Sequence, residues 1–234
     1  MILDNALRLQ YLEAMGIDVW VPRASVQSEQ PVSSNSVTDN AEPETQESAS
    51  DNWDVLQAEV ANCTKCALCK TRTQTVFGSG NKQADWMLVG EAPGQHEDEQ
   101  GLPFVGNAGL LLTEMLRAIG LSRQEVFITN ILKCRPPNNR DPLAGEVESC
   151  NDYLQRQQKL IQPKIIMAVG RIAAQTLLKT DESLARLRGK VHTLNNTPVV
   201  VVYHPAYLLR SLPEKRKAWL DLQLAIQTVR DSEG

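Results

Sequence analysis

The chain of 234 residues is long enough for one domain with appendages, and its content of 42% hydrophobic and 22% charged residues is that of a globular protein. The formal net charge is −4, but residues 24–52 hold six acidic and no basic residues and residues 1–23 carry −1, so residues 53–234 carry +3. No apolar run is long enough for a membrane span and the first residues do not resemble a secretory leader, so we expect a cytoplasmic protein without membrane segments whose mildly basic part permits a nucleic-acid partner.

Two segments precede the main domain. In residues 1–23, apolar residues recur near helical spacing up to Met15, and Gly16 stands where a helix would stop, so a helical and then extended peptide is predicted. A peptide this short cannot fold alone, so it either packs on the core or docks on another protein. Residues 24–52 are rich in Ser, Gln, Glu, Asn and Pro, and we expect them to form a disordered acidic linker.

Residues 53–234 are predicted to form one α/β domain. Apolar runs typical of buried parallel strands alternate with amphipathic helical patterns, which predicts a three-layer α/β/α sandwich around a central, mostly parallel four-stranded sheet. The expected strands span residues 86–90, 126–132, 164–170 and 198–204, and the expected helices span about 106–119, 144–161, 171–179 and 214–230.

Polar residues stand where the expected strands end. In an open α/β sheet these ends line one crevice in which ligands bind, so Glu91, Asn130 and His204 are candidate site residues. Each also has a structural interpretation, as a solvated carboxylate, a hydrogen-bonded amide or an ordinary strand-end imidazole. The same loops carry four arginines suited to phosphate binding: Arg135, Arg140, Arg171 and Arg210.

Five cysteines follow an unusual spacing. Cys63, Cys66 and Cys69 are separated by two residues each, and Cys134 and Cys150 follow far downstream. A zinc ribbon would need a second closely spaced pair of cysteines. Only the first three cysteines match the spacing of bacterial ferredoxins. Because cytosolic cysteines rarely form disulfides, the spacing predicts a four-cysteine metal site, with iron–sulfur and zinc both open.

Four motifs together resemble one enzyme family. "CTKCALCKTR", "GEAPGQHEDEQGLPFVGNAG", "TNILKCRPPNNR" and "HPAYLLR" have the order and approximate spacing of family 4 uracil-DNA glycosylases, the iron–sulfur members of their superfamily. The resemblance covers residues 55–228. It implies a monofunctional hydrolase without a lyase step, which removes uracil from flipped-out deoxyuridine in DNA and so starts base excision repair. The alternatives are a non-catalytic, metal-stapled nucleic-acid-binding module and an iron–sulfur electron carrier.

The resemblance also implies a cofactor. A 4Fe–4S cluster would be held by Cys63, Cys66, Cys134 and Cys150, which leaves Cys69 as a non-ligand.

Three residues are implied to recognise uracil and stabilise its departure. Phe104 would stack on the flipped base, Asn130 would read its N3–H and O4 edge, and His204 would stabilise negative charge on O2. Cytosine presents the opposite pattern to the amide and is expected to be rejected. Ala92 would also line the uracil site, and it stands where the best-known family 1 enzymes carry a water-orienting aspartate.

Two carboxylates complete the expected catalytic set. Glu91 and Glu97 could position water or favour the sugar cation, and Glu97 could also exclude the methyl group of thymine. We hypothesise that much of the catalysis rests on leaving-group stabilisation and substrate strain. The loop also runs straight to Phe104, without the histidine-containing insertion of superfamily members that trap their product covalently, which favours an enzyme that turns over.

Other loop residues are expected to touch DNA. A leucine after "HPAY" is predicted to wedge into the base stack, the alternative being that it packs inward. Gly170 and Arg171 begin a helix whose N-terminal amides suit phosphate. The predicted DNA-binding residues are Arg135, Gly170, Arg171, Leu208, Leu209 and Arg210.

The N-terminal peptide has a possible partner of its own. Within residues 1–23, "LQYLEAMGIDVW" resembles the N-terminal peptide of the psi subunit of bacterial DNA polymerase III. That resemblance implies binding to the replication clamp loader, with Trp20 as an anchor. The protein is otherwise expected to be a bacterial monomer that acts at the nucleoid.

Overall fold

The computed structural model describes residues 52–232 of the chain. The predicted peptide of residues 1–23 lies outside the described residues, and so does the predicted linker except for Asn52. Asn52 caps helix α2 (Trp53–Ala61), because its side-chain oxygen accepts a hydrogen bond from the Asp54 N–H at 2.8 Å. Within the described part, no helix combines the length and the apolar character that crossing a bilayer requires.

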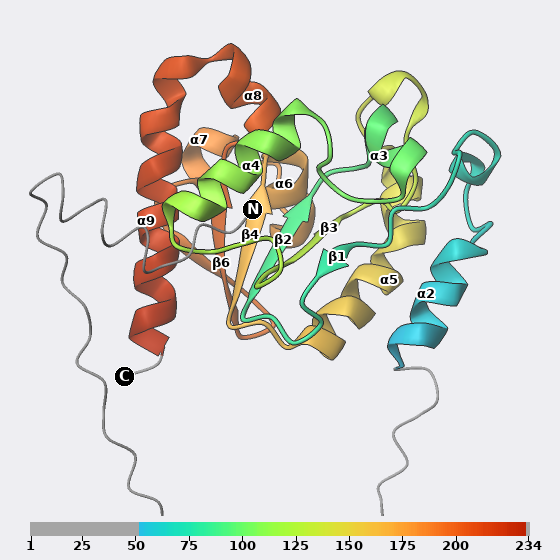
Figure 1. Ribbon diagram of the computed structural model, residues 1–234, viewed down its shortest axis with the longest axis horizontal. Helices are drawn as coiled ribbons and strands as arrows, with labels where there is room; N and C mark the ends of the chain where they lie inside the picture. Colours follow the sequence, from blue (N-terminus) through green and yellow to red (C-terminus); the bar gives the residue numbers. More distant parts are fainter. Residues whose placement is uncertain (1–51, 233–234) are drawn as a thin grey trace, which may run out of the picture. The chain divides into compact units, whose positions relative to one another are not determined.

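A mostly parallel sheet lies at the centre of the fold (Figure 1). Its strand order is β1-β3-β2-β4-β6-β5. The four central strands run parallel, as predicted, but the sheet has six strands because an antiparallel strand is added at each edge. The strands are β1 (Ser79–Gly80), β2 (Trp86–Gly90), β3 (Phe127–Asn130), β4 (Ile165–Val169), β5 (Val191–Leu194) and β6 (Thr197–Val202).

The two edge strands escaped prediction for a physical reason. β1 is two residues long, and β5 is half-exposed, so neither contains an apolar run. β5 is joined to β6 by Asn195 and Asn196, whose φ angles of 48° and 68° form a tight hairpin turn. An Asn-Asn pair before a β-branched run is a turn signal that could have revealed β5.

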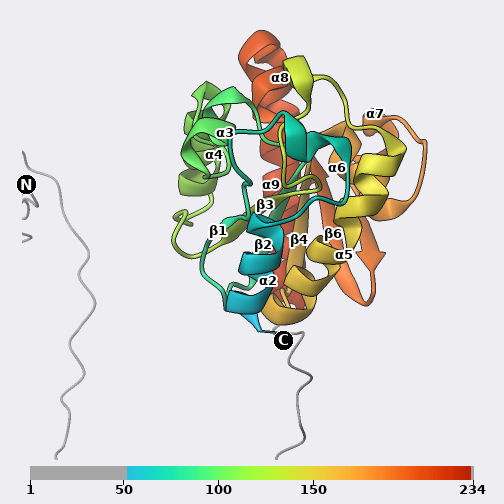
Figure 2. The ribbon, with the colours of Figure 1, turned by 90° about the vertical axis from the view of Figure 1, so that its right-hand side faces the viewer.

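Helices cover both faces of the sheet, which confirms the predicted three-layer sandwich (Figures 1 and 2). Successive residues of β4 alternate between two cores: Ile166 packs on one face and Met167 on the other. The first core includes residues of α2, α5, α6 and α7, and the second includes residues of α4, α8 and α9. These helices are α4 (Asn107–Ala118), α5 (Ala144–Ile161), α6 (Arg171–Leu178), α7 (Leu184–Leu187), α8 (Pro205–Arg210) and α9 (Lys215–Ser232).

The four expected helices are confirmed, each within two residues at either end. The shorter helices were missed because segments of nine residues or fewer often carry too little periodicity to recognise. The missed elements are α2, α3 (Gln95–Gln100), α7, α8 and the 3-10 turns η2 (Ala67–Lys70), η3 (Pro137–Asn139) and η4 (Leu212–Glu214).

Candidate functional site

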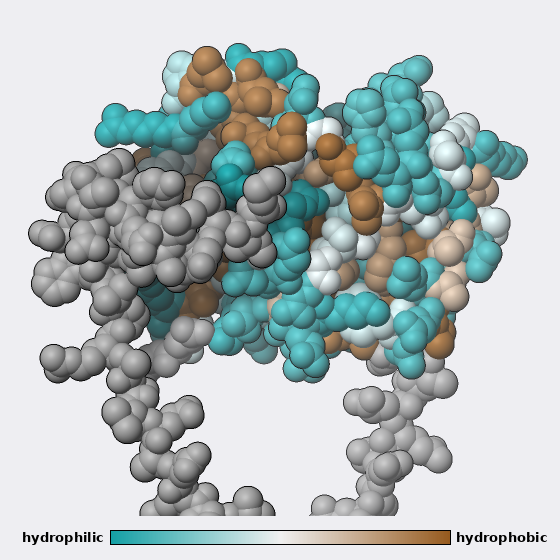
Figure 3. Space-filling view, viewed as in Figure 1, coloured by the Kyte–Doolittle hydropathy of each residue, from teal (hydrophilic) through white to brown (hydrophobic). Residues whose placement is uncertain are grey.

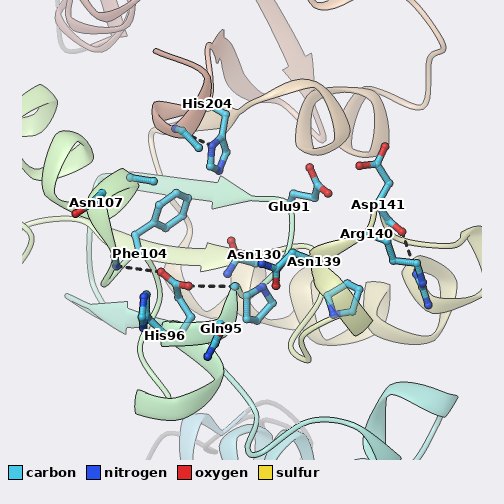
Figure 4. Close-up of a pocket in the computed structure, with 18 of the residues that line it drawn as sticks. Glu91, Gln95, His96, Phe104, Asn107, Asn130, Asn139, Arg140, Asp141 and His204 are labelled. Atoms are coloured by element: carbon cyan, nitrogen blue, oxygen red, sulfur yellow. Dashed lines mark hydrogen bonds between the residues drawn. The ribbon is translucent and has the colours of Figure 1, made fainter. Parts of the chain in front are cut away.

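A cavity of about 600 Å³ opens at the carboxyl ends of the parallel strands (Figure 4). The loop after β2, the end of β3 and the start of α8 contribute its walls. The cavity therefore gathers residues that lie more than a hundred positions apart in the chain. All six predicted catalytic and uracil-binding residues line it: Glu91, Ala92, Glu97, Phe104, Asn130 and His204.

The Asn130 amide is held at the floor of this cavity. Asn130 is the last residue of β3 and is only 2% exposed, and it pairs in register with Gly90 at the end of β2. A Cβ atom on Gly90 would lie 2.3 Å from Oδ1 of Asn130 and 2.7 Å from the Phe104 ring. Glycine at this position thus leaves room for both groups.

Phe104 occupies a backbone conformation that few residues adopt. Its φ angle is +54°, and such a conformation persists only where surrounding contacts enforce it. Arg123 supplies two of these contacts, because its guanidinium donates to the carbonyl oxygens of Phe104 at 3.2 Å and Pro103 at 2.7 Å. The Phe104 ring then stacks on the His204 ring, with centroids 5.6 Å apart and planes 30° apart.

The local geometry fixes both the charge and the tautomer of His204. Burial lowers the pKa of His204 to about 4, with a further decrease from Arg210, so the ring is neutral near neutral pH. Nδ1 accepts a hydrogen bond from the Ala206 N–H at 3.1 Å at the start of α8. A neutral imidazole that accepts at Nδ1 carries its proton on Nε2. His204 therefore presents an uncharged N–H donor to the cavity that it lines.

Glu97 serves as an acceptor for backbone groups of its own loop. Its Oε1 accepts from the N–H groups of Val105 at 2.9 Å and Gly106 at 3.3 Å, and its Oε2 accepts from Gly94 at 3.1 Å. These bonds tie the start of α3 to the segment that follows Phe104 (Figure 4). The carboxylate thus stabilises the loop, whatever else it does at the cavity.

Glu91 differs from Glu97 in its surroundings. Burial raises the pKa of Glu91 to about 7, the nearby Asp141 raises it as well, and Arg171 lowers it. The group therefore changes charge near neutral pH, as a catalytic acid or base can.

The predicted DNA-binding residues do not all gather at one place. Gly170 and Arg171 line a hollow of about 430 Å³ that adjoins the main cavity, and Arg210 lines both. Arg135 lines neither the main cavity nor this hollow and donates to the Asn139 side chain at 2.8 Å. Arg171 donates to a carboxylate oxygen of Asp141 at 2.8 Å, so its charge is partly matched within the protein.

The two leucines of α8 face opposite ways. Leu208 is buried, with 1% of its surface exposed, and packs in the core below α8, whereas Leu209 is 43% exposed. Tyr207 and Leu212 are exposed as well, and Figure 3 shows a hydrophobic surface over α8 and the turn that leads to α9. Leu208 thus follows the inward-packing alternative, and Leu209 is the leucine available to a partner.

Four of the five cysteines belong to one region. Cys134 and Cys150 are buried in the core that contains α2 and α5, and Cys63 and Cys66 pack against it. Burial raises the pKa of Cys134 to about 11 despite a hydrogen bond from Arg72, and the neighbouring thiols of Cys150 and Cys66 add to the increase. Each of the five thiols is free of disulfide bonds.

The donor set is compatible with an iron–sulfur cluster. Within residues 52–232, no three His, Cys, Asp or Glu side chains are placed to hold one metal ion. In a four-iron cluster each thiolate binds its own iron, so the four sulfurs need not converge on one point. The Arg72 guanidinium donates to Sγ of Cys134 at 3.0 Å, the kind of outer contact that orients a thiolate ligand.

Sequence reasoning missed two residues that support the site. Arg123, which holds the backbone at Phe104, lies in a loop without any motif. Lys133 is fully buried behind Asn130. A lysine in the apolar run "NILKC" was the available signal, because a charged residue at such a place must be paired internally.

Comparison with known proteins agrees with this site. The family model described as the uracil DNA glycosylase superfamily matches residues 77–223. The type-4 uracil-DNA glycosylase of Archaeoglobus fulgidus is 48% identical over 68% of this chain and 84% of its own length. The enzymes of the same name from Saccharolobus solfataricus and Thermotoga maritima are 47% and 41% identical, over 71% and 68% of this chain and 81% and 83% of their own lengths.

Proposed function

The chain belongs to the uracil-DNA glycosylase superfamily, and we propose that it removes uracil from DNA by hydrolysing the N-glycosidic bond of a flipped-out deoxyuridine, the first step of base excision repair. The observation that carries this proposal is the pairing of a buried Asn130 amide with a neutral, Nε2-protonated His204 in one cavity. Three type-4 uracil-DNA glycosylases that are 41–48% identical to this chain support it.

Base recognition follows from the donors and acceptors of the pocket. Uracil presents an N3–H donor beside an O4 acceptor, and the Asn130 amide accepts from the first and donates to the second. Cytosine reverses this pattern, so its entry would leave buried polar groups unpaired. Phe104 supplies the apolar face on which the flipped base stacks.

Cleavage of the glycosidic bond is assisted by stabilisation of the departing uracil anion at O2. The C1′–N1 bond breaks, its electron pair leaves with uracil, and the negative charge spreads onto O2, where the His204 Nε2–H donates a hydrogen bond. A water oxygen then bonds to C1′, and its proton is released. Because His204 is neutral, it contributes a fixed dipole rather than a proton, in the manner of an oxyanion hole.

A nicking assay tests the activity directly. A labelled duplex with one uracil should be cut at that position after incubation with the protein followed by alkali, whereas the matched thymine and cytosine duplexes should stay intact. Incubation without alkali should leave the strand whole, because a monofunctional glycosylase has no lyase step. Binding of the uracil duplex without any alkali-sensitive site would favour a non-catalytic nucleic-acid-binding module instead.

The ionised form of Glu91 is proposed to assist cleavage by favouring the sugar cation or orienting water. With a pKa of about 7, the carboxylate is mostly protonated one pH unit lower, so the single-turnover rate should be about fivefold lower at about pH 6 than at its plateau. In Glu91→Gln this inflection should vanish and the plateau should fall by about tenfold. A Glu91→Gln profile that still bends near pH 7 would contradict the assignment.

The effect of Glu91→Gln can also be measured as a change in thermal stability. The pKa of Glu91 is raised on folding, so the folded state binds its proton more tightly and loses stability as the pH rises towards 7. Glu91→Gln should therefore have a higher Tm than the unsubstituted protein at about pH 8 and an equal one at about pH 4. Glu97→Gln is the matched control and should lower the Tm at both pH values, because the amide cannot accept hydrogen bonds from all three backbone N–H groups.

We propose further that Cys63, Cys66, Cys134 and Cys150 hold a 4Fe–4S cluster. Their common location around one core and the Arg72 contact to Cys134 support this ligand set. When bound, the cluster would cross-link the segment after α2, the loop after β3 and helix α5. Its role in this proposal is to brace the loop that follows Asn130.

Two substitutions distinguish a proposed cluster ligand, Cys66, from the proposed non-ligand, Cys69. Cys66→Ser should remove most of the visible absorbance and lower the iron content well below about four atoms per chain, because a cluster of this type needs four thiolates. Cys69→Ser should retain both, because Cys69 is not among the cysteines that pack on the core. Loss of iron in Cys69→Ser, or its retention in Cys66→Ser, would revise the ligand set.

The remaining proposals concern DNA contacts outside the pocket and the place of the protein in the cell. Gly170, Arg171 and Arg210 are proposed to contact phosphates beside the pocket, with Leu209 as the residue inserted into the base stack and Arg135 at a more distant contact. The protein is proposed to act as a monomer in the bacterial cytoplasm, at the nucleoid. Binding of residues 1–23 to the clamp loader stays a prediction.

A further inference from the structure

Lys133 is a buried lysine that the proposed reaction does not use. Its side chain is 1% exposed, and its Nζ lies 2.6 Å from Oγ1 of Thr129, 2.8 Å from the carbonyl oxygen of Asn130 and 2.7 Å from Oε1 of Gln157. An ammonium group has three N–H donors, and these three acceptors match them one for one. Among the described residues, no carboxylate pairs with it.

The network continues from Lys133 into two other elements. Gln157, on α5, donates through Nε2 to the carbonyl oxygen of Phe77 at 2.9 Å. Thr129, on β3, donates to the same carbonyl at 3.0 Å. Lys133 therefore joins the end of β3 to α5 and to the segment that precedes β1.

The contact to Asn130 falls at a sensitive position. β3 ends at Asn130, and the peptide that joins it to Ile131 is held on both sides, because the Ile131 N–H donates to the Gly90 carbonyl oxygen at 2.9 Å and the Asn130 carbonyl oxygen accepts from Lys133. The Asn130 side chain lines the cavity. Rotation of this peptide would move the amide relative to the Phe104 ring and the His204 imidazole. Burying an ammonium is costly, and three well-aimed hydrogen bonds offset that cost only if the site remains ordered.

We propose that Lys133 is a positioning residue that fixes the Asn130 peptide, and through it the amide that reads uracil; this inference rests on the proposed function. Lys133 acts through Asn130 and does not touch the base. Lys133 directly precedes Cys134. The loop after β3 therefore carries both a proposed cluster ligand and the lysine that holds Asn130 in place.

Lys133→Met tests the role, because it keeps the apolar stem and removes all three donors. The single-turnover rate on a uracil duplex should fall by about tenfold, in line with the cost of misplacing a group in a reaction site. Free uracil should inhibit the variant about tenfold less well, while its affinity for a duplex that carries an abasic-site analogue should change by less than about twofold.

Double variants distinguish positioning from a general structural role. In an Asn130→Ala background, Lys133→Met should cost less than about twofold, since the residue it positions is gone. In a His204→Ala background, it should again cost about tenfold, because the two effects are independent. Equal losses in both backgrounds would overturn the proposal.

Control variants show whether the effect of Lys133→Met is specific. Lys190→Met, at an exposed lysine, should behave as the unsubstituted protein. If Lys133→Met does not fold or loses its visible absorbance, Thr129→Val removes one acceptor instead and should reproduce the same background dependence at about threefold. Failure of the unsubstituted protein to release uracil would refute the proposed function, whereas normal release by both it and Lys133→Met would refute this inference alone.

Discussion

Replacing His204 by alanine should lower the single-turnover rate of uracil release by about 10²–10³-fold, the usual cost of removing one preorganised donor from an anion-stabilising site. The ring is neutral because burial lowers its pKa to about 4, and its proton lies on Nε2 because Nδ1 accepts from the Ala206 N–H. The donor is therefore set before the base arrives. Rapid-quench measurement with enzyme in excess reports the chemical step.

The control for this experiment is another histidine outside the cavity. His192 lies on the edge strand β5, where its Nε2 is 2.8 Å from the carbonyl oxygen of Leu187, so His192→Ala should leave the rate within about twofold. Affinity of His204→Ala for an abasic-site duplex should also be retained. A loss for His204→Ala no larger than that for His192→Ala would remove His204 from the chemistry.

The pH profile separates His204 from Glu91. His204 gains charge only as the pH falls towards 4, whereas Glu91 gains it as the pH rises through about 7. The inflection near pH 7 should therefore persist in His204→Ala, at a much lower rate, because the carboxylate titrates independently of the imidazole. The same inflection should be absent from Glu91→Gln.

The interior of this fold was predictable because burial leaves a simple pattern. The apolar runs that became β2 and β4 are buried along their whole length, so they stand out in the chain. β1 and β5 lie at the edges, where half-exposed residues carry no such pattern. Their pairing depends on neighbouring strands that local sequence does not encode.

The sequence allowed us to predict which residues line the site, but not the contacts that each of them makes. Strand ends and motif order placed Asn130 and His204 in one cavity. The backbone bonds of Glu97 depend on how its loop folds back, and the inward direction of Leu208 depends on the turn of α8, so neither could be inferred from residue type. Lys133 shows the same limit, because its acceptors come from two separate elements.

Gly90→Ala should reduce uracil release by about 10²-fold or more, because one added methyl group would displace both groups that are proposed to hold the base. The new Cβ would lie 2.3 Å from Oδ1 of Asn130 and 2.7 Å from the Phe104 ring, and Gly90 itself is buried in the centre of the sheet. Phe104 cannot move aside freely, since Arg123 holds its carbonyl. Inhibition by free uracil should weaken in parallel with the rate.

Gly145→Ala provides the matched control for this substitution. Gly145 lies in the first turn of α5, and a Cβ there would meet nothing within 4 Å among the described residues, so the variant should retain full activity and gain slightly in stability through better helix propensity. If Gly90→Ala also releases uracil at the normal rate, the Asn130 amide and the Phe104 ring must tolerate displacement, and the base would then be selected chiefly by contacts other than theirs. A reduced rate with unchanged uracil inhibition would instead mean that the clash perturbs the chemical step and leaves recognition intact.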